Sequence, residues 1–470
     1  MAANEKMMRE SSVLSLIMKM SLPMVIIMIV QVVYNMADIF FIGRTGNSLM
    51  VAALTLASPL FAAFSAFNTL IGFGGCTAIS LALGAGDKDK VKKYSSFVLY
   101  ASLILGTILS ALTLIFKDPV LSFLGADADT AGFASSYITI IALGTPFSIL
   151  SGALATASRA DGDSKSAMIG NLTGTLLNIL LDPLFISVFK LGCAGAAYAT
   201  VIGNIVSCVI VLNMMRKKEI YSLSLKDFSL RPEISLHVLK LGIPMAISTL
   251  LSAFSGIFSN QIAVSYGNDI VAARGVAGKV AMLIPMIIMG LCMGVQPAIS
   301  YAFGRRDLKR VRKVTLGTGL FSCIVGTLIA AVCFLFRGSL VSAFVNGASE
   351  SILQTGKLML TASLITVPFC GMYQMGSTYL QATGKVNYAT LTSLMRQGII
   401  YIPVLYLMNG LMGLNGLIYA GVVVDTVSTI ITLLLCRNYS HEIRGIQKNI
   451  SVRLYKLYST RKLCLSPPSL

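Results

Sequence analysis

Three aspartates, Asp38, Asp182 and Asp425, lie inside long apolar stretches of this sequence. A carboxylate at mid-membrane costs about 2.5 to 3.5 kcal/mol on insertion scales, so one that persists there normally faces a cavity or a partner and marks an ion or proton path. Asp38 and Asp182 are therefore candidates for cation or proton binding, although each also fits a hydrogen-bonded strut between helices. Asp425 has Arg396 or Lys279 as a candidate partner, and a buried pair of that kind is more often structural.

Uncharged polar side chains accompany both candidates at helical spacing. Residues separated by three, four or seven positions share one face of a helix. The first half of the chain has three such polar faces, formed by Gln31, Tyr34, Asn35 and Asp38; by Asn171, Thr175, Asn178 and Asp182; and by Thr200, Asn204 and Ser207. If these faces pack together, their carboxylate, amide and hydroxyl oxygens form a pocket suited to a hard monovalent cation or a proton.

The stretches that carry these residues are long enough to cross a bilayer. Hydrophobic residues make up 55% of the chain and charged residues 12%, and uncharged runs of about 20 residues recur from end to end. The sequence therefore predicts an all-α polytopic membrane protein with twelve transmembrane helices. Their expected ranges are 13–42, 49–83, 95–116, 134–157, 166–189, 193–215, 234–265, 270–303, 314–336, 355–382, 388–409 and 413–436.

The second half of the chain repeats the first at an offset of about 220 residues. The matching positions include Pro23 with Pro244, Ser80 with Ser300, Gly84 with Gly304, Asp87 with Asp307, Pro146 with Pro368, Pro183 with Pro403, and Gly192 with Gly413. Because each half holds an even number of helices, the two copies enter the membrane from the same side and form two pseudo-symmetric lobes with a cleft between them. The expected organisation is a lobe at 1–215, a linker at 216–240, a second lobe at 241–436 and a basic tail at 437–470.

The distribution of positive charge indicates an orientation in the membrane. The formal charge is +18, but most of the 37 Lys and Arg residues fall in every second connection and in the tail, as the positive-inside bias requires. We therefore expect a multi-pass protein of the inner (cytoplasmic) cell membrane with both termini cytoplasmic, not a nucleic-acid partner. The tail fits either a helix on the anionic inner leaflet or a disordered segment.

The second lobe does not repeat the acidic residues of the first. At the repeat offset Ser259 takes the place of Asp38, and Ile402 that of Asp182, so ion coupling is expected to be confined to the first lobe. A substrate cavity is expected to be lined by Met282, Met286, Met289, Tyr373, Gln374, Gln397 and Tyr401. The methionines also fit a lipid-facing or core-filling role. Pro23 lies near Asp38 within the first span and is a candidate hinge.

Three segments resemble the multidrug and toxic compound extrusion family: Tyr34–Asp38 (YNMAD), Asn178–Ile186 (NILLDPLFI) and Ala194–Thr200 (AGAAYAT). The resemblance spans nearly the whole chain. It implies twelve helices in two lobes that form a V, and antiport of organic cations or drugs against sodium ions or protons. It also implies a cation site at Asp38, Asn178, Asp182 and Thr200. Some relatives carry a second acidic site in the C-terminal lobe. This chain has Asn260, Gln261 and Gln374 in the matching spans, so we expect the branch whose cation site lies in the N-terminal lobe.

The expected function is a secondary active efflux antiporter that exports organic, mostly cationic compounds in exchange for protons or sodium ions, acting as a monomer. The alternative is a flippase for lipid-linked sugars, which would need a strongly basic cavity, whereas the candidate intramembrane cations are only Arg274, Lys279 and Arg396. An enzyme is not expected, because the only histidines are His237 and His441 and no H-E-x-x-H or G-x-S-x-G pattern occurs. The cysteines form no C-x-x-C pair and are interpreted as small hydrophobes, so neither a metal nor a cofactor is expected.

Overall fold

The computed structural model describes residues 2–45, 47–344 and 350–463, and within these it leaves some side chains undescribed, among them those of Asn35 and Asp38. All of its regular elements are helices. The first half contains α1 (Ala2–Glu10), α2 (Val13–Leu16), the π-helix η1 (Ile17–Ser21), α3 (Leu22–Gly43), α4 (Ser48–Leu56), α5 (Ser58–Ala85), α6 (Lys88–Ile115), α7 (Lys117–Phe123), α8 (Ala131–Ala157), α9 (Ser164–Asp182), the π-helix η2 (Pro183–Val188) and α10 (Cys193–Arg216).

The second half repeats this order after a connecting segment that carries the 3-10 helix η3 (Leu225–Asp227). It contains α11 (Ser235–Val264), α12 (Asn268–Ala281), α13 (Leu283–Gly304), α14 (Leu308–Leu335), α15 (Arg337–Phe344), α16 (Glu350–Ile365), α17 (Val367–Ala382), α18 (Val386–Leu394), the π-helix η4 (Met395–Ile399), α19 (Tyr401–Met412) and α20 (Leu414–Leu463). The last residues of the expected linker therefore form the first turns of α11.

Eleven stretches of the described chain are long and apolar enough to cross a membrane, and a twelfth is the pair α16 and α17, which bend by 44° at their junction. Pro368 is the second residue of α17, next to this bend, and a proline removes a backbone donor and so favours a break. Its repeat mate Pro146 lies inside the unbroken α8. The fold class expected from the sequence is confirmed, with the tenth span broken in two.

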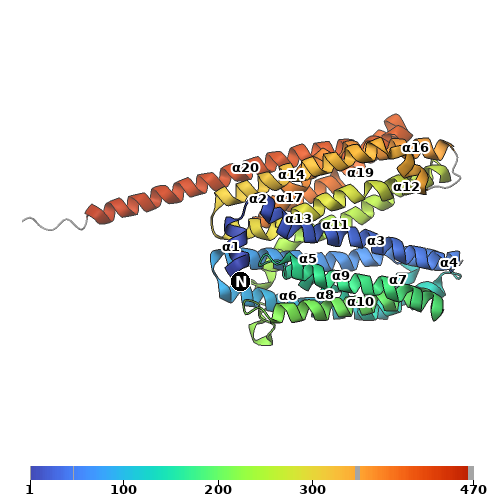
Figure 1. Ribbon diagram of the computed structural model, residues 1–470, viewed down its shortest axis with the longest axis horizontal. Coiled ribbons are helices and arrows are strands. Elements are labelled where there is room, and N and C mark those ends of the chain that lie inside the picture. Colours follow the sequence, from blue (N-terminus) through green and yellow to red (C-terminus); the bar gives the residue numbers. More distant parts are fainter. Residues whose placement is uncertain (1, 46, 345–349, 464–470) are drawn as a thin grey trace, which may run out of the picture.

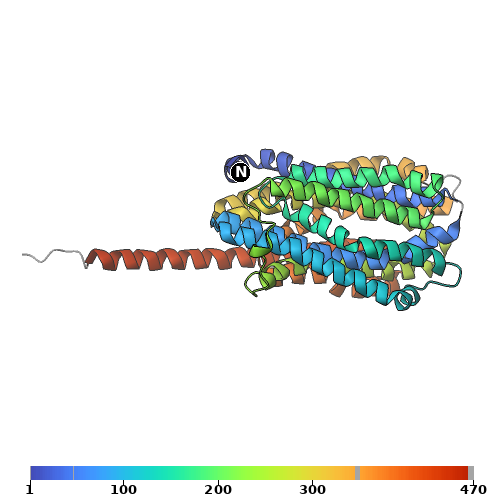
Figure 2. The ribbon, with the colours of Figure 1, turned by 90° about the horizontal axis from the view of Figure 1, so that it is seen from below.

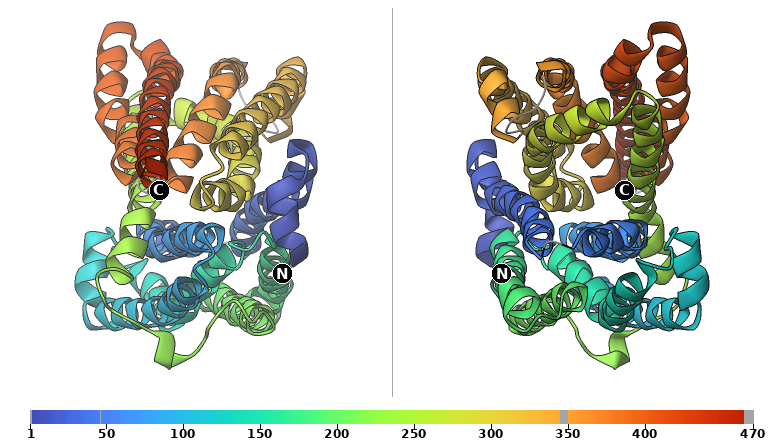
Figure 3. Two further views of the ribbon diagram at one scale, coloured as in Figure 1. Left: turned by 90° about the vertical axis from the view of Figure 1, so that its left-hand side faces the viewer. Right: turned by 90° about the vertical axis from the view of Figure 1, so that its right-hand side faces the viewer.

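In the end-on views most helices of the first half lie below and most of the second half lie above, with the dark-blue α3 rising beside the upper group (Figure 3). Local contacts repeat between them. Asp87 and Asp307 each cap a helix by accepting a hydrogen bond from the backbone three residues later. Ser80 Oγ donates to Ala160 O at 2.9 Å, and Ser300 Oγ donates to Ala382 O at 2.8 Å. The internal repeat is thus reproduced at the level of single hydrogen bonds.

A glycine-rich seam joins the lobes at the end where the N-terminus lies. A Cβ atom added to Gly74 would stand 2.1 Å from the Val238 carbonyl oxygen, and one added to Gly294 would stand 2.3 Å from the Ser21 Cα. Ser21 Oγ also donates to Leu291 O across this seam at 2.7 Å. Only glycine allows backbones to approach so closely. Away from the seam the lobes diverge toward the opposite end (Figure 1).

The C-terminal segment continues the last helix. Helix α20 runs unbroken from Leu414 to Leu463, and two perpendicular views show it projecting beyond the bundle along its own axis (Figures 1 and 2). Residues 464–470 lie outside the described chain. The end from which α20 projects is also the end that carries α1 (Figure 1).

Candidate cation site and inter-lobe cleft

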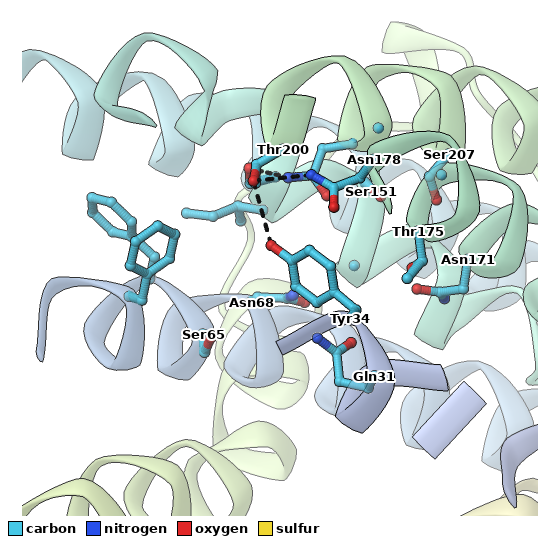
Figure 4. Close-up of a pocket in the computed structure, with 18 of the residues that line it drawn as sticks. Gln31, Tyr34, Ser65, Asn68, Ser151, Asn171, Thr175, Asn178, Thr200 and Ser207 are labelled. Atoms are coloured by element: carbon cyan, nitrogen blue, oxygen red, sulfur yellow. Dashed lines mark hydrogen bonds between the residues drawn. The ribbon is translucent and has the colours of Figure 1, made fainter. Parts of the chain in front are cut away.

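A polar cavity of about 250 Å³ lies inside the first lobe, among α3, α5, α8, α9 and α10. We call it the N-lobe cavity (Figure 4). Its polar lining consists of Gln31, Tyr34, Ser65, Asn68, Ser148, Ser151, Asn171, Thr175, Asn178, Thr200, Asn204 and Ser207. Residues from all three polar faces expected from the sequence line this one space, but Asp182 is not among the described residues that line it, and the side chain of Asp38 is not described.

One hydroxyl connects three helices at this cavity. Asn178 Nδ2 on α9 donates to Thr200 Oγ1 on α10 at 3.3 Å, and the Tyr34 hydroxyl on α3 lies 3.4 Å from the same oxygen (Figure 4). The side chain of Asn178 is buried, and its Oδ1 accepts no hydrogen bond from the described residues. An amide oxygen held in this way is an available ligand for a hard cation.

Asp182 is the last residue of α9 and is fully buried. It follows Asn178 by four positions, so the two residues share one face of α9. The π-helix η2 begins directly after it at Pro183, and π-turns are frequent at functional sites. The side chains of Asn35 and Asp38 lie outside the described residues, although the backbone of both belongs to α3.

Four cavity residues escaped the sequence analysis: Ser65 and Asn68 on α5, and Ser148 and Ser151 on α8. The two residues of each pair are three positions apart and so share one face of their helix. This spacing is the sequence signal that could have identified them. The signal is weak, because serine is common in transmembrane helices and makes local hydrogen bonds there. Ser148 Oγ accepts a hydrogen bond from Asn204 Nδ2 at 2.8 Å, and this bond connects α8 to the expected polar face of α10.

A larger cavity of about 470 Å³ lies between the lobes and is called here the inter-lobe cleft. Of the residues expected to line a substrate cavity, four do line it: Met289, Tyr373, Gln374 and Gln397. Three do not: Met282, Met286 and Tyr401. The methionine stripe was derived from one continuous helix, but α12 ends at Ala281 and α13 begins at Leu283. Met282 lies at this break, so it does not share a helical face with the methionines of α13.

The two cavities share a wall. Gln31, Asn68 and Asn171 line both the N-lobe cavity and the inter-lobe cleft. Gly152 lies behind Asn68 in this wall, and a Cβ atom on it would stand 1.9 Å from Asn68 Nδ2. A change at any of these residues therefore alters the lining of both spaces.

Two arginines line the inter-lobe cleft, and both are already engaged. Arg396 Nε donates to Asp425 Oδ1 at 2.8 Å, which identifies Arg396 as the partner of that aspartate. The Arg396 guanidinium also lies over the Tyr373 ring, 4.5 Å from its centroid. Arg159 Nη1 donates to Met293 O at 3.2 Å and lies over the Phe73 ring. The charge of Arg396 is therefore paired with a carboxylate, whereas Arg159 contacts only neutral groups and keeps its charge.

Pro23 lies in the first turn of α3, directly after η1. The sequence placed it in the interior of a span, where it would remove one hydrogen bond from a regular ladder. In the structure the π-turn at Ile17–Ser21 precedes it, and the wider turn accommodates the missing donor. Its repeat mate Pro244 lies inside α11.

The cysteines of the described chain lie in or beside the helices, and some of their thiols donate to backbone carbonyls, as Cys436 does to Gly376 O at 3.5 Å. All eight cysteines of the described chain are free, and five of them are buried: Cys76, Cys193, Cys208, Cys292 and Cys370. No group of three metal-ligating side chains occurs among the described residues. The structure of this part of the chain thus gives no geometry for a disulfide or a metal centre.

Comparison with known proteins connects this architecture to a family. The family model described as MatE matches residues 23–184 and 244–407, and these segments coincide with the two copies of the repeat. The multidrug export protein MepA of Staphylococcus saprophyticus is 34% identical over 91% of this chain and 94% of its own length. The protein of the same name from Staphylococcus haemolyticus is 35% identical over the same shares.

Solved structures agree with the fold. A MATE crystal structure in complex with MaL6 superposes with a TM-score of 0.89 at 24% identity, covering 94% of this chain and 99% of that one. The structure described as an outward-facing conformation of a multidrug resistance MATE family transporter of the MOP superfamily gives a TM-score of 0.88 at 24% identity, covering 93% and 98%. Likeness at this identity establishes the shared two-lobed fold.

Proposed function

The chain belongs to the MatE family, and from that premise we propose that it is a secondary active exporter of small organic, mostly cationic compounds, driven by inward movement of protons or sodium ions. The observation that carries the proposal is the wall of Gln31, Asn68 and Asn171. It separates an oxygen-lined cavity suited to a cation from a larger cleft suited to a drug-sized molecule. In an antiporter the binding of the two ligands must be coupled, and a shared wall offers a route for that coupling.

The coupling site is proposed at Asp38, Asn178, Asp182 and Thr200, with Tyr34, Gln31, Asn35, Asn171, Thr175 and Asn204 as its polar support. Asn178 and Thr200 are joined by a hydrogen bond, and the Asn178 amide oxygen is free to bind a cation. Asp182, one turn further along the same face of α9, is buried in the same lobe. A carboxylate kept at this depth supplies the negative charge that a proton or sodium ion neutralises.

The substrate site is proposed in the inter-lobe cleft. Methionines from both lobes, including Met24 and Met289, line it together with Tyr373 and several amides. Flexible thioethers adapt to ligands of different shapes, and aromatic faces attract organic cations. This lining fits a carrier of varied cationic drugs better than one of a single anionic metabolite.

The proposed orientation places both termini in the cytoplasm. The end that carries α1 also carries basic connections, such as Lys92 and Lys93 after α5 and Arg312 and Lys313 after α13, which favours the inner side. Arg310 Nε donates to Met8 O there at 3.1 Å, so the start of α14 and α1 lie together. The seam then closes the cytoplasmic side, and the diverging lobes open outward.

Transport follows from differential binding to two arrangements of the lobes. Uptake of a cation at the coupling site changes the packing of α3 against α9 and α10, and the shared wall transmits this change to the cleft. Substrate is released outward as the cation binds, and the cation-loaded lobes rearrange at the seam and release the cation inward. The second lobe has neither aspartate, so the proposal confines ion coupling to the first lobe and requires only one chain.

The basic cavity of a lipid-linked sugar flippase finds little support in this geometry. The cleft arginines Arg159 and Arg396 are held by a backbone carbonyl and a carboxylate. The other two candidate cations, Arg274 and Lys279, do not line the cleft. An anionic pyrophosphate group would meet only the charge of Arg159 among the described residues of the cleft, because Asp425 pairs with Arg396.

The test is efflux of ethidium from proteoliposomes with proton and sodium gradients imposed separately. The proposal predicts that one of the two gradients drives uphill ethidium movement, and that the other does so weakly or not at all. Equal transport with no gradient, or preferential flipping of a lipid-linked oligosaccharide, would contradict it.

A further inference from the structure

A third cavity, of about 870 Å³, opens on the outer face of the second lobe, between α14 and α20 with α17 as its floor. We call it the C-lobe groove. Its sides are apolar and open to the surroundings: the exposed fractions of Leu316, Leu320 and Met372 are 60%, 64% and 44%. Helix α17 contacts both flanking helices, so the groove is a gap between two helices over a continuous floor.

One end of the groove is basic. Lys309, Arg312 and Arg437 line it, and all three side chains are exposed. No carboxylate of the described chain forms an ion pair with any of them. The nearby Glu442 pairs with Lys385 at 2.9 Å. The groove therefore combines a positively charged end with an apolar length.

The internal repeat shows what such a groove does in the first lobe. At an offset of 220, Ser95, Ser96 and Tyr100 on α6 correspond to Thr315, Leu316 and Leu320 on α14. In the first lobe the connecting segment after α10 folds back over these positions. Ser95, Ser96 and Tyr100 donate hydrogen bonds to the carbonyls of Ser222, Ser224 and Leu223.

Aromatic packing holds that segment in place. The Phe228 ring stacks on Phe97 with centroids 6.2 Å apart and meets Tyr100 edge to face at 5.5 Å. The Tyr221 hydroxyl donates to Ser158 O at the end of α8 at 3.4 Å. The first lobe thus fills its groove with its own chain, which offers oxygen acceptors to α6 and apolar rings to the space beside it.

The second lobe has no such cover in the described chain, because α20 continues straight on where α10 ends. Thr315 Oγ1, the counterpart of the Ser95 hydroxyl, is buried within the groove and has no hydrogen-bond partner among the described residues. The missing occupant must supply negative charge near Lys309 and Arg312, and apolar length along Leu316 and Leu320.

We propose that the C-lobe groove binds an anionic phospholipid of the cytoplasmic leaflet. The phosphate lies among Lys309, Arg312 and Arg437, and one acyl chain lies along α14 and α17. Basic pockets between transmembrane helices on the cytoplasmic side are the expected sites for such head groups. The lipid takes the place that the connecting segment takes in the first lobe.

The absence of tryptophan from the sequence gives a direct test. A single Leu320→Trp substitution places a fluorophore in the groove. Leu328→Trp is the matched control on the same helix: the native Leu328 side chain is 62% exposed and lies outside the groove. Both proteins are reconstituted in vesicles that contain brominated phosphatidylglycerol or brominated phosphatidylcholine, and quenching is measured against the mole fraction of brominated lipid.

The proposal predicts that Leu320→Trp reaches half-maximal quenching at an about tenfold lower fraction of phosphatidylglycerol than of phosphatidylcholine, given the attraction of three basic residues. Leu328→Trp should show no such preference. The preference at position 320 should disappear when the three basic residues of the groove are also replaced, by Lys309→Gln, Arg312→Gln and Arg437→Gln. The charge-matched control replaces three basic residues outside the groove, by Lys93→Gln, Arg305→Gln and Lys313→Gln, and should keep the preference. Elution volume and thermal unfolding confirm that each variant is folded.

Three results would overturn the proposal. Equal quenching by both lipids at position 320 would show that the groove contacts bilayer lipids without selecting an anionic head group. A preference that survives the triple groove substitution would place the anionic lipid elsewhere. Absence of quenching by either lipid at position 320 would show that another occupant, such as the C-terminal residues of the chain, covers the groove.

Discussion

Gly84 of α5 and Tyr301 of α13 approach so closely that a Cβ atom on Gly84 would stand 2.1 Å from the Tyr301 carbonyl oxygen. The repeat mate of Gly84 repeats the contact in reverse, since a Cβ on Gly304 would stand 2.2 Å from Leu81 O. The neighbouring atoms are backbone, which cannot move aside as a side chain does. This reciprocal pair fixes how near the lobes lie at the closed end.

Gly84→Ala should therefore destabilise the closed seam. We expect a loss of about 1 to 3 kcal/mol from overpacking, seen as a lower unfolding temperature when buried cysteines such as Cys76 react with a thiol dye on heating. Gly256→Ala is the control, because it meets open space within the same kind of helix. Equal behaviour of the two variants would show that the seam is loose in the working protein.

Thr200→Val tests the hydroxyl that joins α3, α9 and α10. The substitution keeps the shape of the side chain but removes the acceptor of the Asn178 hydrogen bond. We expect cation affinity to fall by about 1 to 3 kcal/mol, the usual effect of leaving a buried polar group unpaired, while the protein stays folded. Thr200→Ser should retain most of the affinity.

The control is Thr173→Val, because Thr173 is an exposed threonine of α9 whose hydroxyl is bonded only to its own helix. A similar affinity loss in both valine variants would refute the assignment.

Gly152→Ala tests communication through the shared wall. The added methyl group would overlap Asn68 Nδ2, and that flexible side chain must move. We expect a folded transporter in which more cations enter per exported ethidium, because the wall no longer links the two cavities. Gly132→Ala, on the same helix with nothing near its Cβ, should leave the ratio unchanged. The ratio is measured as cation influx against ethidium efflux in one liposome preparation, and an unaltered ratio in Gly152→Ala would remove the wall from the mechanism.

An ion cluster at the end that carries α1 predicts a pH-dependent stability. Lys218 Nζ lies 2.8 Å from Asp161 Oδ2 and 2.9 Å from Asp163 Oδ2. Burial opposes the charge on Asp163, but hydrogen bonds from Ser166 and Lys218 outweigh it and lower the pKa of Asp163 below 3.8. Burial likewise opposes the charge on Lys218, and the two aspartates outweigh it and raise the pKa of Lys218 above 10.5.

The lowered pKa of Asp163 means that its stabilisation is present above pH 3.8 and is lost as the pH falls through the folded value. The raised pKa of Lys218 means that its contribution is present below pH 10.5 and is lost at more alkaline pH. Lys218→Met should thus cost about 2 kcal/mol at neutral pH, and its deficit should shrink below pH 3.8. The exposed pair of Lys90 with Asp87 serves as control, since Lys90→Met should change stability little. A deficit of Lys218→Met that persists unchanged in acid would contradict this account.

Much of the fold followed from the sequence because membrane spans and internal repeats have strong signals. The apolar runs predicted the spans, and paired residues such as Asp87 and Asp307 predicted two copies of one unit. The bend between α16 and α17 was missed, because Pro146 and Pro368 look alike in sequence and only the packing around them decides which helix breaks.

The candidate site was predicted where polar side chains recur on one helical face, as with Asn171, Thr175 and Asn178. The predicted set of residues was incomplete where a contributing polar residue belongs to no long polar stripe, as with Asn68, or is of a type common in transmembrane helices, as with Ser148. The substrate list included Met282 because periodicity assumes an unbroken helix, and the break at that residue is a tertiary feature. The filled groove of the first lobe had no sequence signal at all, since it depends on a connecting segment folding back onto α6.

The central claim is that the carboxylate of Asp182, fully buried in the first lobe, takes up the cation whose entry drives export. The most direct test measures ethidium efflux and inward cation flux in the same proteoliposomes for the native protein and for Asp182→Asn. The account predicts that the variant folds and reconstitutes normally but loses both the gradient-driven efflux and the coupled cation flux. Undiminished gradient-driven efflux by Asp182→Asn would contradict it.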